Sequence, residues 1–225
     1  MSFTLIRSPR RKKTLSIQVD GTGAVSVRVP MRTSRADIDR FLAEKKQWLQ
    51  KTIDRLRENS QARPTREFAA GERFPFLGET YVLKVVEGVN AGDALIFTGR
   101  EFILKPEALK GARVLFHLWY QRQARTHFEE RVRFFGGPLE LFPRAVVLSN
   151  ARSRWGSCST DGRLAFAWRL ILAPQDVVDY VVIHELCHMR VRNHSSDYWR
   201  LVENVYPNHR PCRIWLKDHG HLLTL

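Results

Sequence analysis

One segment, PQDVVDYVVIHELCHMR at residues 174–190, constrains the fold more than any other part of this sequence. A helix formed by this segment would be apolar on nearly every side, and such a helix has to be buried. Pro174 suits a first helical turn, and Asp176 complements the positive end of the helix dipole. The sequence therefore predicts a buried helix, and a chain of 225 residues is long enough to enclose it in a sizeable core.

The same segment carries the pattern H-E-x-x-H. At about 100° per residue, His184 and His188 lie roughly 40° apart on one helical face, so both imidazoles can reach one ion. Glu185 points about 100° away from His184, which lets its carboxylate contact a bound water without being a ligand itself. A solvated helix could carry these residues by chance, but three ionisable groups on an otherwise apolar helix are costly to bury without a partner. A metal ion is the simplest such partner.

A third ligand is needed, because a catalytic zinc site uses three protein ligands and keeps one position for water, whereas a structural site closes four. His194 is the best candidate, since a helix end expected at residues 192–193 would let the chain turn back toward the metal. Glu203 and His209 are rival third ligands. The spacing of the three histidines matches the metzincin pattern H-E-x-x-H-x-x-G-x-x-H, but Val191 stands in place of its glycine, so the turn must differ. The sequence predicts one Zn²⁺ per chain, held by these histidines.

Residues 1–106 are predicted to form a small, β-rich α+β module. Its expected elements are a β-hairpin with a glycine-rich turn, an amphipathic helix with Ser34 or Thr33 as candidate N-cap, and several short strands. In order, these elements span residues 14–30, 34–58 and 71–106, with a linker at 58–67.

Residues 107–225 are predicted to form the second domain. A long helix is expected to end at the sequence Gly136-Gly137-Pro138, because glycine and proline both terminate helices. Two strands, the buried helix and a short helix that Ser195 or Ser196 can cap follow along the chain. In order, these elements span residues 109–135, 143–150, 162–170, 174–190 and 196–206.

Several motifs of the second domain, in this order, resemble the YgjP-like metallopeptidase domain family. They are RWGSCS at 154–159, GRLAFAWRLILAP at 162–174, DYVVIHELCHMRVRNHSSDYW at 179–199, YPN at 206–208 and a Trp-Leu pair at 215–216. The resemblance implies the fold class α+β, with a zincin-like catalytic domain that contains the buried HExxH helix, is related to SprT-like proteases and follows the small module. It also implies that Glu185 is the catalytic carboxylate and that the zinc ligands are His184, His188 and His194.

The predicted chemistry is metal-assisted hydrolysis of a peptide or protein, with Glu185 as general base for a zinc-activated water. The strand at 162–170 is expected to bind an extended substrate through main-chain hydrogen bonds. Gly156 is expected at a position where a side chain would obstruct the site. Candidate substrate or oxyanion contacts are Arg154, Tyr198, Tyr206 and His209.

The charge of the chain leaves two alternatives open. A formal net charge of +14 favours polyanionic partners. Arginines crowd residues 152–192, and their planar side chains suit phosphate, so a metal-dependent nucleotide or phosphoanhydride hydrolase of the nucleoside triphosphate pyrophosphatase type is one alternative. The other is a nucleic-acid-associated protein whose zinc is structural.

A cytoplasmic location is expected, with no membrane as partner. The sequence contains no apolar run of membrane-spanning length and no secretory signal at its start. Its three cysteines, Cys158, Cys187 and Cys212, are too few and too scattered for a disulfide framework.

Overall fold

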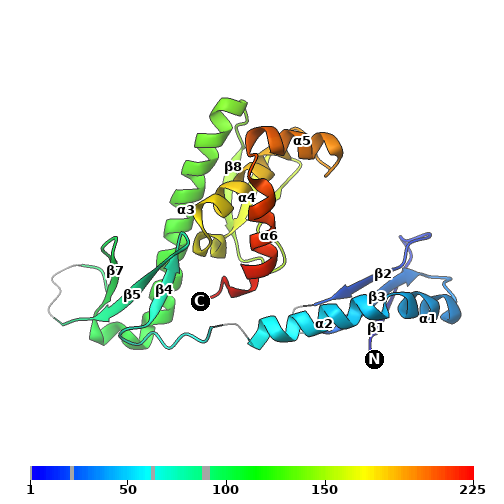
Figure 1. The fold of residues 1–225 in the computed structure, drawn as a ribbon, viewed down its shortest axis with the longest axis horizontal. Helices are drawn as coiled ribbons and strands as arrows, with labels where there is room; N and C mark the ends of the chain where they lie inside the picture. Colours follow the sequence, from blue (N-terminus) through cyan, green and yellow to red (C-terminus); the bar gives the residue numbers. More distant parts are fainter. Residues whose placement is uncertain (1, 21–22, 62–63, 88–91) are drawn as a thin grey trace. The chain divides into compact units, whose positions relative to one another are not determined.

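The structure, a computed structural model, describes residues 2–20, 23–61, 64–87 and 92–225. Helices are combined with three small sheets, which confirms the predicted α+β class (Figure 1). The chain divides into two compact units, Met1–Arg63 and Pro64–Leu225. The strands expected at residues 71–106 thus belong to the second unit, while a domain made of residues 107–225 stays a prediction.

The N-terminal unit contains a three-stranded sheet in the order β1-β3-β2. The predicted hairpin is confirmed, because β2 (Ser16–Val19) pairs antiparallel with β3 (Val25–Pro30). Residues 21–22 of its turn lie outside the described residues. Strand β1 (Thr4–Ser8), which the sequence did not predict, pairs in parallel with β3.

The helix predicted at residues 34–58 is instead two helices, α1 (Arg35–Glu44) and α2 (Lys46–Gln61). Lys45 separates them as the C-cap of α1. Of the two candidate N-caps, the cap is Ser34, whose side chain accepts a hydrogen bond from the backbone N–H of Asp37. One face of β3 and the apolar faces of the two helices form a small aliphatic core of Val25, Val27, Val29, Ile38, Leu49 and Ile53.

The C-terminal unit begins with a four-stranded sheet in the order β4-β5-β7-β6, which confirms the predicted short strands. A 3-10 helix, η1 (Pro106–Gly111), then leads into the long helix α3 (Ala112–Leu139). The strands are β4 (Arg73–Phe76), β5 (Glu79–Val85), β6 (Leu95–Phe97) and β7 (Glu101–Leu104). Sheet and helix share a core of contacting aromatic rings, which includes Phe74, Phe102, Phe116, Trp119 and Tyr120.

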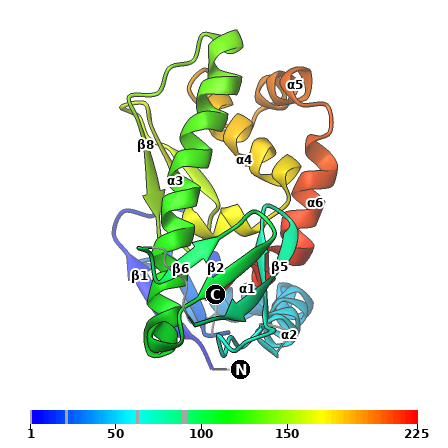
Figure 2. The same ribbon diagram turned by 90° about the vertical axis from the view of Figure 1, so that its left-hand side faces the viewer.

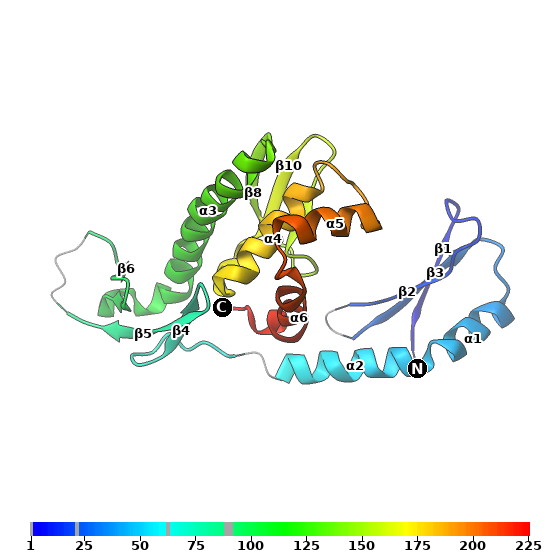
Figure 3. The ribbon, with the colours of Figure 1, turned by 45° about the horizontal axis from the view of Figure 1, so that its top comes forward.

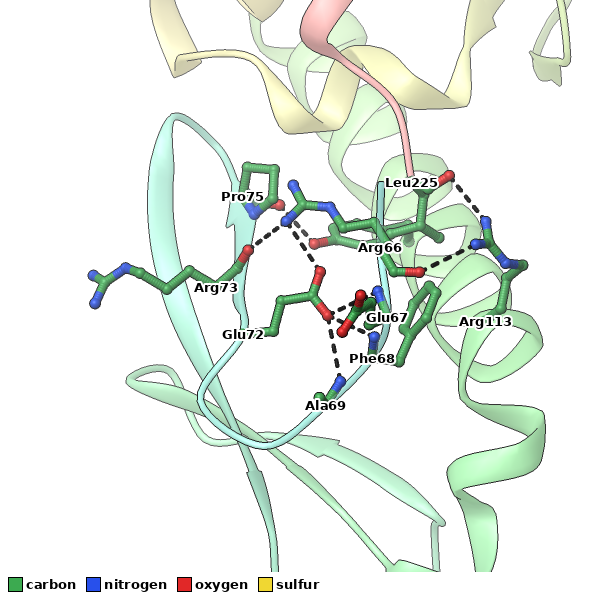
Figure 4. A network of polar contacts seen from close by, with 10 residues as sticks. Arg66, Glu67, Phe68, Ala69, Glu72, Arg73, Pro75, Arg113 and Leu225 are labelled. Atoms are coloured by element: carbon green, nitrogen blue, oxygen red, sulfur yellow. Dashed lines mark hydrogen bonds and ion pairs between the residues drawn. The ribbon is translucent and has the colours of Figure 1, made fainter. Parts of the chain in front are cut away.

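The loop that opens this unit is fixed by the carboxylate of Glu72 (Figure 4). One of its oxygens accepts hydrogen bonds from the N–H groups of three successive residues centred on Phe68, which has a φ of 59°. Arg113 of α3 donates to the carbonyl oxygens of Arg66 and Leu225 and so ties the loop to the last residue of the chain. These bonds compensate the strained backbone and allow the Phe68 ring to be buried.

The prediction that α3 ends at Gly136-Gly137-Pro138 is wrong, because the helix continues to Leu139. Pro138 lies in the last turn, where its missing N–H removes a single helical hydrogen bond. The helix ends at Glu140, whose φ of 54° is left-handed and whose N–H bonds to the carbonyls of Gly136 and Gly137. Gly136 is required by packing, since a Cβ there would lie 2.5 Å from the carbonyl oxygen of Leu141.

A second sheet precedes the buried helix, in the order β8-β10-β9. The two predicted strands are confirmed as β8 (Ala145–Ser149) and β10 (Arg163–Ala167), which pair in parallel. The loop between them contributes a further strand, β9 (Gly156–Cys158), which is antiparallel to β10. A 3-10 helix, η2 (Trp168–Leu172), then leads to α4.

The predicted buried helix is confirmed as α4 (Gln175–Cys187), which lies between α3 and α6 (His209–His219) in Figures 1 and 2. Of the two buried carboxylates on α4, that of Asp179 is paired: the guanidinium of Arg131 on α3 donates to both of its oxygens over 2.6 and 3.0 Å. Removing one partner of such a buried pair costs about 3–5 kcal/mol. The pair therefore fixes α4 against α3.

The helix α5 (Ser196–Val205) follows α4 along the chain (Figure 3) and begins where predicted, with the Ser195 side chain accepting a hydrogen bond from the N–H of Tyr198. After α6, a short 3-10 helix, η3 (Gly220–Leu222), precedes the end of the chain. Within the described ranges, none of the helices combines the length and the apolar character needed to cross a membrane.

Candidate metal centre

Three histidines at the end of α4 and in the loop after it bring their side chains together. The Nε2 atom of His194 lies 3.0 Å from Nε2 of His188 and 3.2 Å from Nε2 of His184. Among the described residues, these three histidines form the one group of three or more metal-ligating side chains (His, Cys, Asp or Glu) that is close enough to hold a metal ion. Ligands about 2.0–2.1 Å from a tetrahedral zinc ion lie about 3.3 Å from each other, so the three imidazoles fit such an ion.

The helix that carries the first two histidines ends earlier than the predicted 192–193. His188 is already the C-cap of α4, and the N–H of Val191 bonds back to the carbonyl of Cys187 over 3.0 Å. The carbonyl of Val191 lies 3.0 Å from Nδ1 of His188. A carbonyl can only accept, so this bond places the proton on Nδ1 and leaves Nε2 of the neutral ring free to bind a metal.

Burial favours the neutral form of two of these histidines. It lowers the pKa of His184 to about 3, with smaller contributions from His188, His194 and Arg213. Burial also lowers the pKa of His188. The neutral imidazole is the form that binds a metal. The Nδ1 atom of His184 is buried without a hydrogen-bond partner among the described residues.

Glu185, next to the first histidine, is 5% exposed. Its burial raises the pKa of the carboxyl to about 7, while the charge of Arg154 acts in the opposite direction. The carboxylate packs against Gly156 of β9, where an added Cβ would lie 2.5 Å from Oε1 of Glu185, so the prediction that a side chain would obstruct this position is confirmed. Among the described residues none hydrogen bonds to the carboxylate, which leaves it free to bind a water molecule or a substrate.

Two of the four candidate contacts lie beside the histidines. Arg154 lines a hollow of about 360 Å³ together with His184 and Glu185. Tyr198 is fully buried, and its hydroxyl donates to the carbonyl of His184 over 2.9 Å. Its ring also stacks on that of His188, with centroids 4.4 Å apart. In the structure Tyr198 therefore supports the helix end, and a direct contact with substrate stays a prediction.

The other candidates lie outside the cluster. The hydroxyl of Tyr206 donates to the carbonyl of Asp176, eight residues before His184 and so about 12 Å away along the helix. His209 is 4% exposed, and its ring stacks on Trp199 at a centroid distance of 5.8 Å. Glu203, a rival ligand in the sequence, forms an exposed ion pair with Arg210.

The expectation that the strand at 162–170 binds substrate through its main chain is wrong. Strand β10 is the central strand of its sheet and pairs with β8 on one side and β9 on the other, so neither of its edges is free. The strand at the edge of this sheet that contacts α4 is β9. The sequence suggested a tight loop here, because a three-residue strand gives too short an alternating pattern to recognise.

Two further residues of the site were missed from the sequence. The ring of Trp199 lies 5.8 Å from that of His194 and 6.0 Å from that of His184. The guanidinium carbon of Arg213 lies 5.1 Å from the centre of the Trp199 ring. Both line a second hollow with His184, His194 and Tyr180. Helical spacing could have indicated α5 and α6, but one sequence does not tell which face of each turns toward the site.

Three converging imidazoles beside a buried carboxylate are typical of metal-dependent hydrolases. A family model described as YgjP-like, metallopeptidase domain, matches residues 13–219, and the chain therefore belongs to this family. The resemblance noted in the sequence is confirmed. Membership makes the chain a metallopeptidase, a hydrolase that binds a metal and acts on a peptide or protein.

Two solved structures are similar to part of the chain. The crystal structure of the metallopeptidase zymogen of Pyrococcus abyssi abylysin is 23% identical with a TM-score of 0.37, over 42% of this chain and 94% of that one. The zymogen of Methanocaldococcus jannaschii jannalysin is 17% identical with a TM-score of 0.36, over 42% of this chain and 96% of that one. No curated protein matches the sequence.

Proposed function

We propose that this metallopeptidase uses one zinc ion held by His184, His188 and His194, with Glu185 as the general base of peptide-bond hydrolysis. The observation that carries the proposal is the close approach of three imidazoles directly beside a buried carboxylate. The Nε2 atom of His194 lies 3.0 Å from that of His188 and 3.2 Å from that of His184. Unliganded imidazoles gain little from such an approach, whereas a shared cation would make it favourable.

The donor set suits zinc. Three neutral nitrogen ligands with no carboxylate or thiolate among them leave a fourth position open, as in catalytic rather than structural zinc sites. When bound there, zinc supplies a Lewis acid that polarises the substrate carbonyl and activates a water molecule. The bond between His188 and the carbonyl of Val191 holds that ring in the orientation and tautomer that binding needs.

Glu185 is placed to move the proton. Its free carboxylate, held beside His184 by the contact with Gly156, accepts the proton of the attacking water and afterwards delivers it to the leaving amine. Arg154 lines the same hollow, and we propose it as a contact for the substrate carbonyl. The substrate main chain would lie along β9, the edge strand that contacts α4.

Parallel assays with a protein substrate and with nucleotides test this proposal. Purified, zinc-loaded protein is incubated with a casein-like protein and, separately, with nucleoside triphosphates, and Glu185→Gln serves as the blank for both. We expect proteolysis well above the blank and no nucleotide turnover. Turnover of nucleotides alone would replace the proposal by a nucleotide hydrolase, and tight zinc binding with neither activity would indicate a structural metal.

A further inference from the structure

We infer that the enzyme recognises a carboxylate of its substrate through Arg213 and Lys217, at a subsite beside the histidine cluster. The inference rests on the proposed function and names the chemistry that a preferred peptide carries. The carboxylate is that of an Asp or Glu side chain close to the cleaved bond or that of the C-terminal residue of the peptide, since both present the same group.

The first observation is the charge around the site. Two hollows open beside the histidines, and both are lined by His184 and by Arg213. The hollow that Glu185 lines is also lined by Arg154 and Lys217, and Glu185 is the one carboxylate among its lining residues. Arg154 is the cation whose charge acts on Glu185. Three cations, Arg154, Arg213 and Lys217, thus line this hollow with a single carboxylate, so positive charge is in excess there.

The second observation is that neither Arg213 nor Lys217 has a carboxylate partner in the described part of the chain. Two exposed arginines nearby in the sequence do have one: Arg210, on the same helix, pairs with Glu203 over 3.3 Å, and Arg200 pairs with Asp197. Arg213 and Lys217 are four residues apart on α6, so they lie on one helical face, where like charges repel. A carboxylate bound between them relieves that repulsion.

The third observation is that Arg213 is held in place. Its guanidinium carbon lies 5.1 Å from the centre of the Trp199 ring, and that ring lies against the rings of His184 and His194. An arginine stacked on an aromatic ring keeps its N–H groups free at the edge of its plane, the arrangement that binds a carboxylate with two hydrogen bonds. Trp199 thus holds Arg213 beside the histidine cluster.

Binding to the inactive Glu185→Gln protein tests the subsite without turnover. The probes are four fluorescein-labelled hexapeptides that contain either Glu or Gln at the central positions and end in either a free or an amidated carboxyl group. Affinities are measured by fluorescence anisotropy at about 0.15 M salt, which screens non-specific attraction to a basic surface. We expect at least one carboxylate to strengthen binding roughly tenfold, and the pair of peptides that shows it identifies the source.

The variants then locate the effect. Arg213→Gln combined with Lys217→Gln should abolish the preference, whereas Arg210→Gln, which removes the same kind of charge from the same helix outside both hollows, should retain it. Equal affinities for all four peptides, or a preference that survives the double substitution, would overturn the inference. Inorganic triphosphate that binds more tightly than every peptide, and loses this binding in the double variant, would assign the subsite to phosphate instead.

Cleavage distinguishes a failure of this inference from a failure of the proposed function. An active enzyme that cleaves the Glu and Gln peptides at equal rates contradicts the subsite alone. An enzyme that cleaves no peptide contradicts the proposed function, while the anisotropy measurement still decides whether Arg213 and Lys217 bind a carboxylate.

Discussion

The two compact units of the chain differ in where they place charge and where they place chemistry. Residues 1–63 contain 15 Lys and Arg against six Asp and Glu, so this quarter of the chain supplies most of the net charge of +14. Its core is a small aliphatic cluster. Residues 64–225 enclose a large aromatic core and contain every residue of the candidate metal centre. Most of the net charge, which first suggested a polyanionic partner, thus belongs to the unit that contains none of the residues that the proposed catalysis uses.

The largest effect that should separate the units is expected at the histidines. Replacing His188 by Ala removes one of three proposed ligands. Loss of a residue that only hydrogen bonds to a ligand weakens metal binding by up to about a hundredfold, so loss of the ligand itself should weaken it more. Peptide hydrolysis should disappear with it. Elemental analysis after dialysis measures the metal, and His209→Ala, which removes a buried imidazole outside the cluster, is the matched control. Full metal occupancy in His188→Ala would exclude this residue as a ligand.

A smaller loss is expected from Gly156→Ala. The new Cβ would lie 2.5 Å from the carboxylate of Glu185 and must displace it, and a shift of about 1 Å can cost roughly a hundredfold in rate. The histidines are untouched, so the metal should stay bound while kcat falls. Gly137→Ala is the control, because a Cβ there meets no atom within 4 Å. Wild-type kcat in Gly156→Ala would show that the carboxylate can move without consequence.

In the N-terminal unit, the expected effect is on stability and not on chemistry. Ile38 is fully buried in the small core, and its replacement by Ala should lower the free energy of unfolding of this unit by about 2–5 kcal/mol. Cleavage of a short neutral peptide should change less than twofold. Calorimetric unfolding and peptide assays on the same sample measure both. Ile183→Ala, on α4 beside His184, should instead reduce stability and cleavage together, and a loss of cleavage equal in both variants would show that the units are not independent.

The smallest effect on cleavage is expected at the basic segment of the N-terminal unit. Neutralising Arg10, Arg11, Lys12 and Lys13 together should leave hydrolysis of a small neutral peptide unchanged. If this charge serves a polyanion, the same change should weaken binding to short DNA or RNA, and binding should fall steeply with added salt. Fluorescence titration at low and at physiological salt measures this. No binding even at low salt would remove nucleic acid as a partner.

The parts of the fold that the sequence predicted are those encoded locally. Helix α4 follows from the apolar residues within one segment, and the start of α5 follows from its serine cap. The placement of His184 and His188 on one face follows from helical periodicity alone. The prediction that a side chain at position 156 would obstruct the site was possible because Gly156 lies within RWGSCS, one of the motifs that resemble the family. Each of these inferences needed residues at most a few turns apart.

The parts that the sequence did not predict depend on distant packing. Pro138 lies inside α3 and Gly136 packs closely on the chain at Leu141, and no local rule indicates either. The parallel pairing of β1 with β3 joins strands that are not adjacent in the sequence. Trp199 and Arg213 reach the site from two helices whose orientation is decided by the core. Helical periodicity identifies which face of a helix is buried, but not which part of the chain that face packs against.

The central claim, that the metal is held by histidines and the proton is moved by Glu185, is tested most directly by measuring zinc content and peptide hydrolysis on the same preparations of wild type and Glu185→Gln. The amide cannot accept the proton, whereas the three imidazoles are unchanged. The account predicts about one zinc per chain in both proteins and hydrolysis lowered by about 10²–10⁴-fold in the variant. Near wild-type hydrolysis by zinc-loaded Glu185→Gln would contradict it.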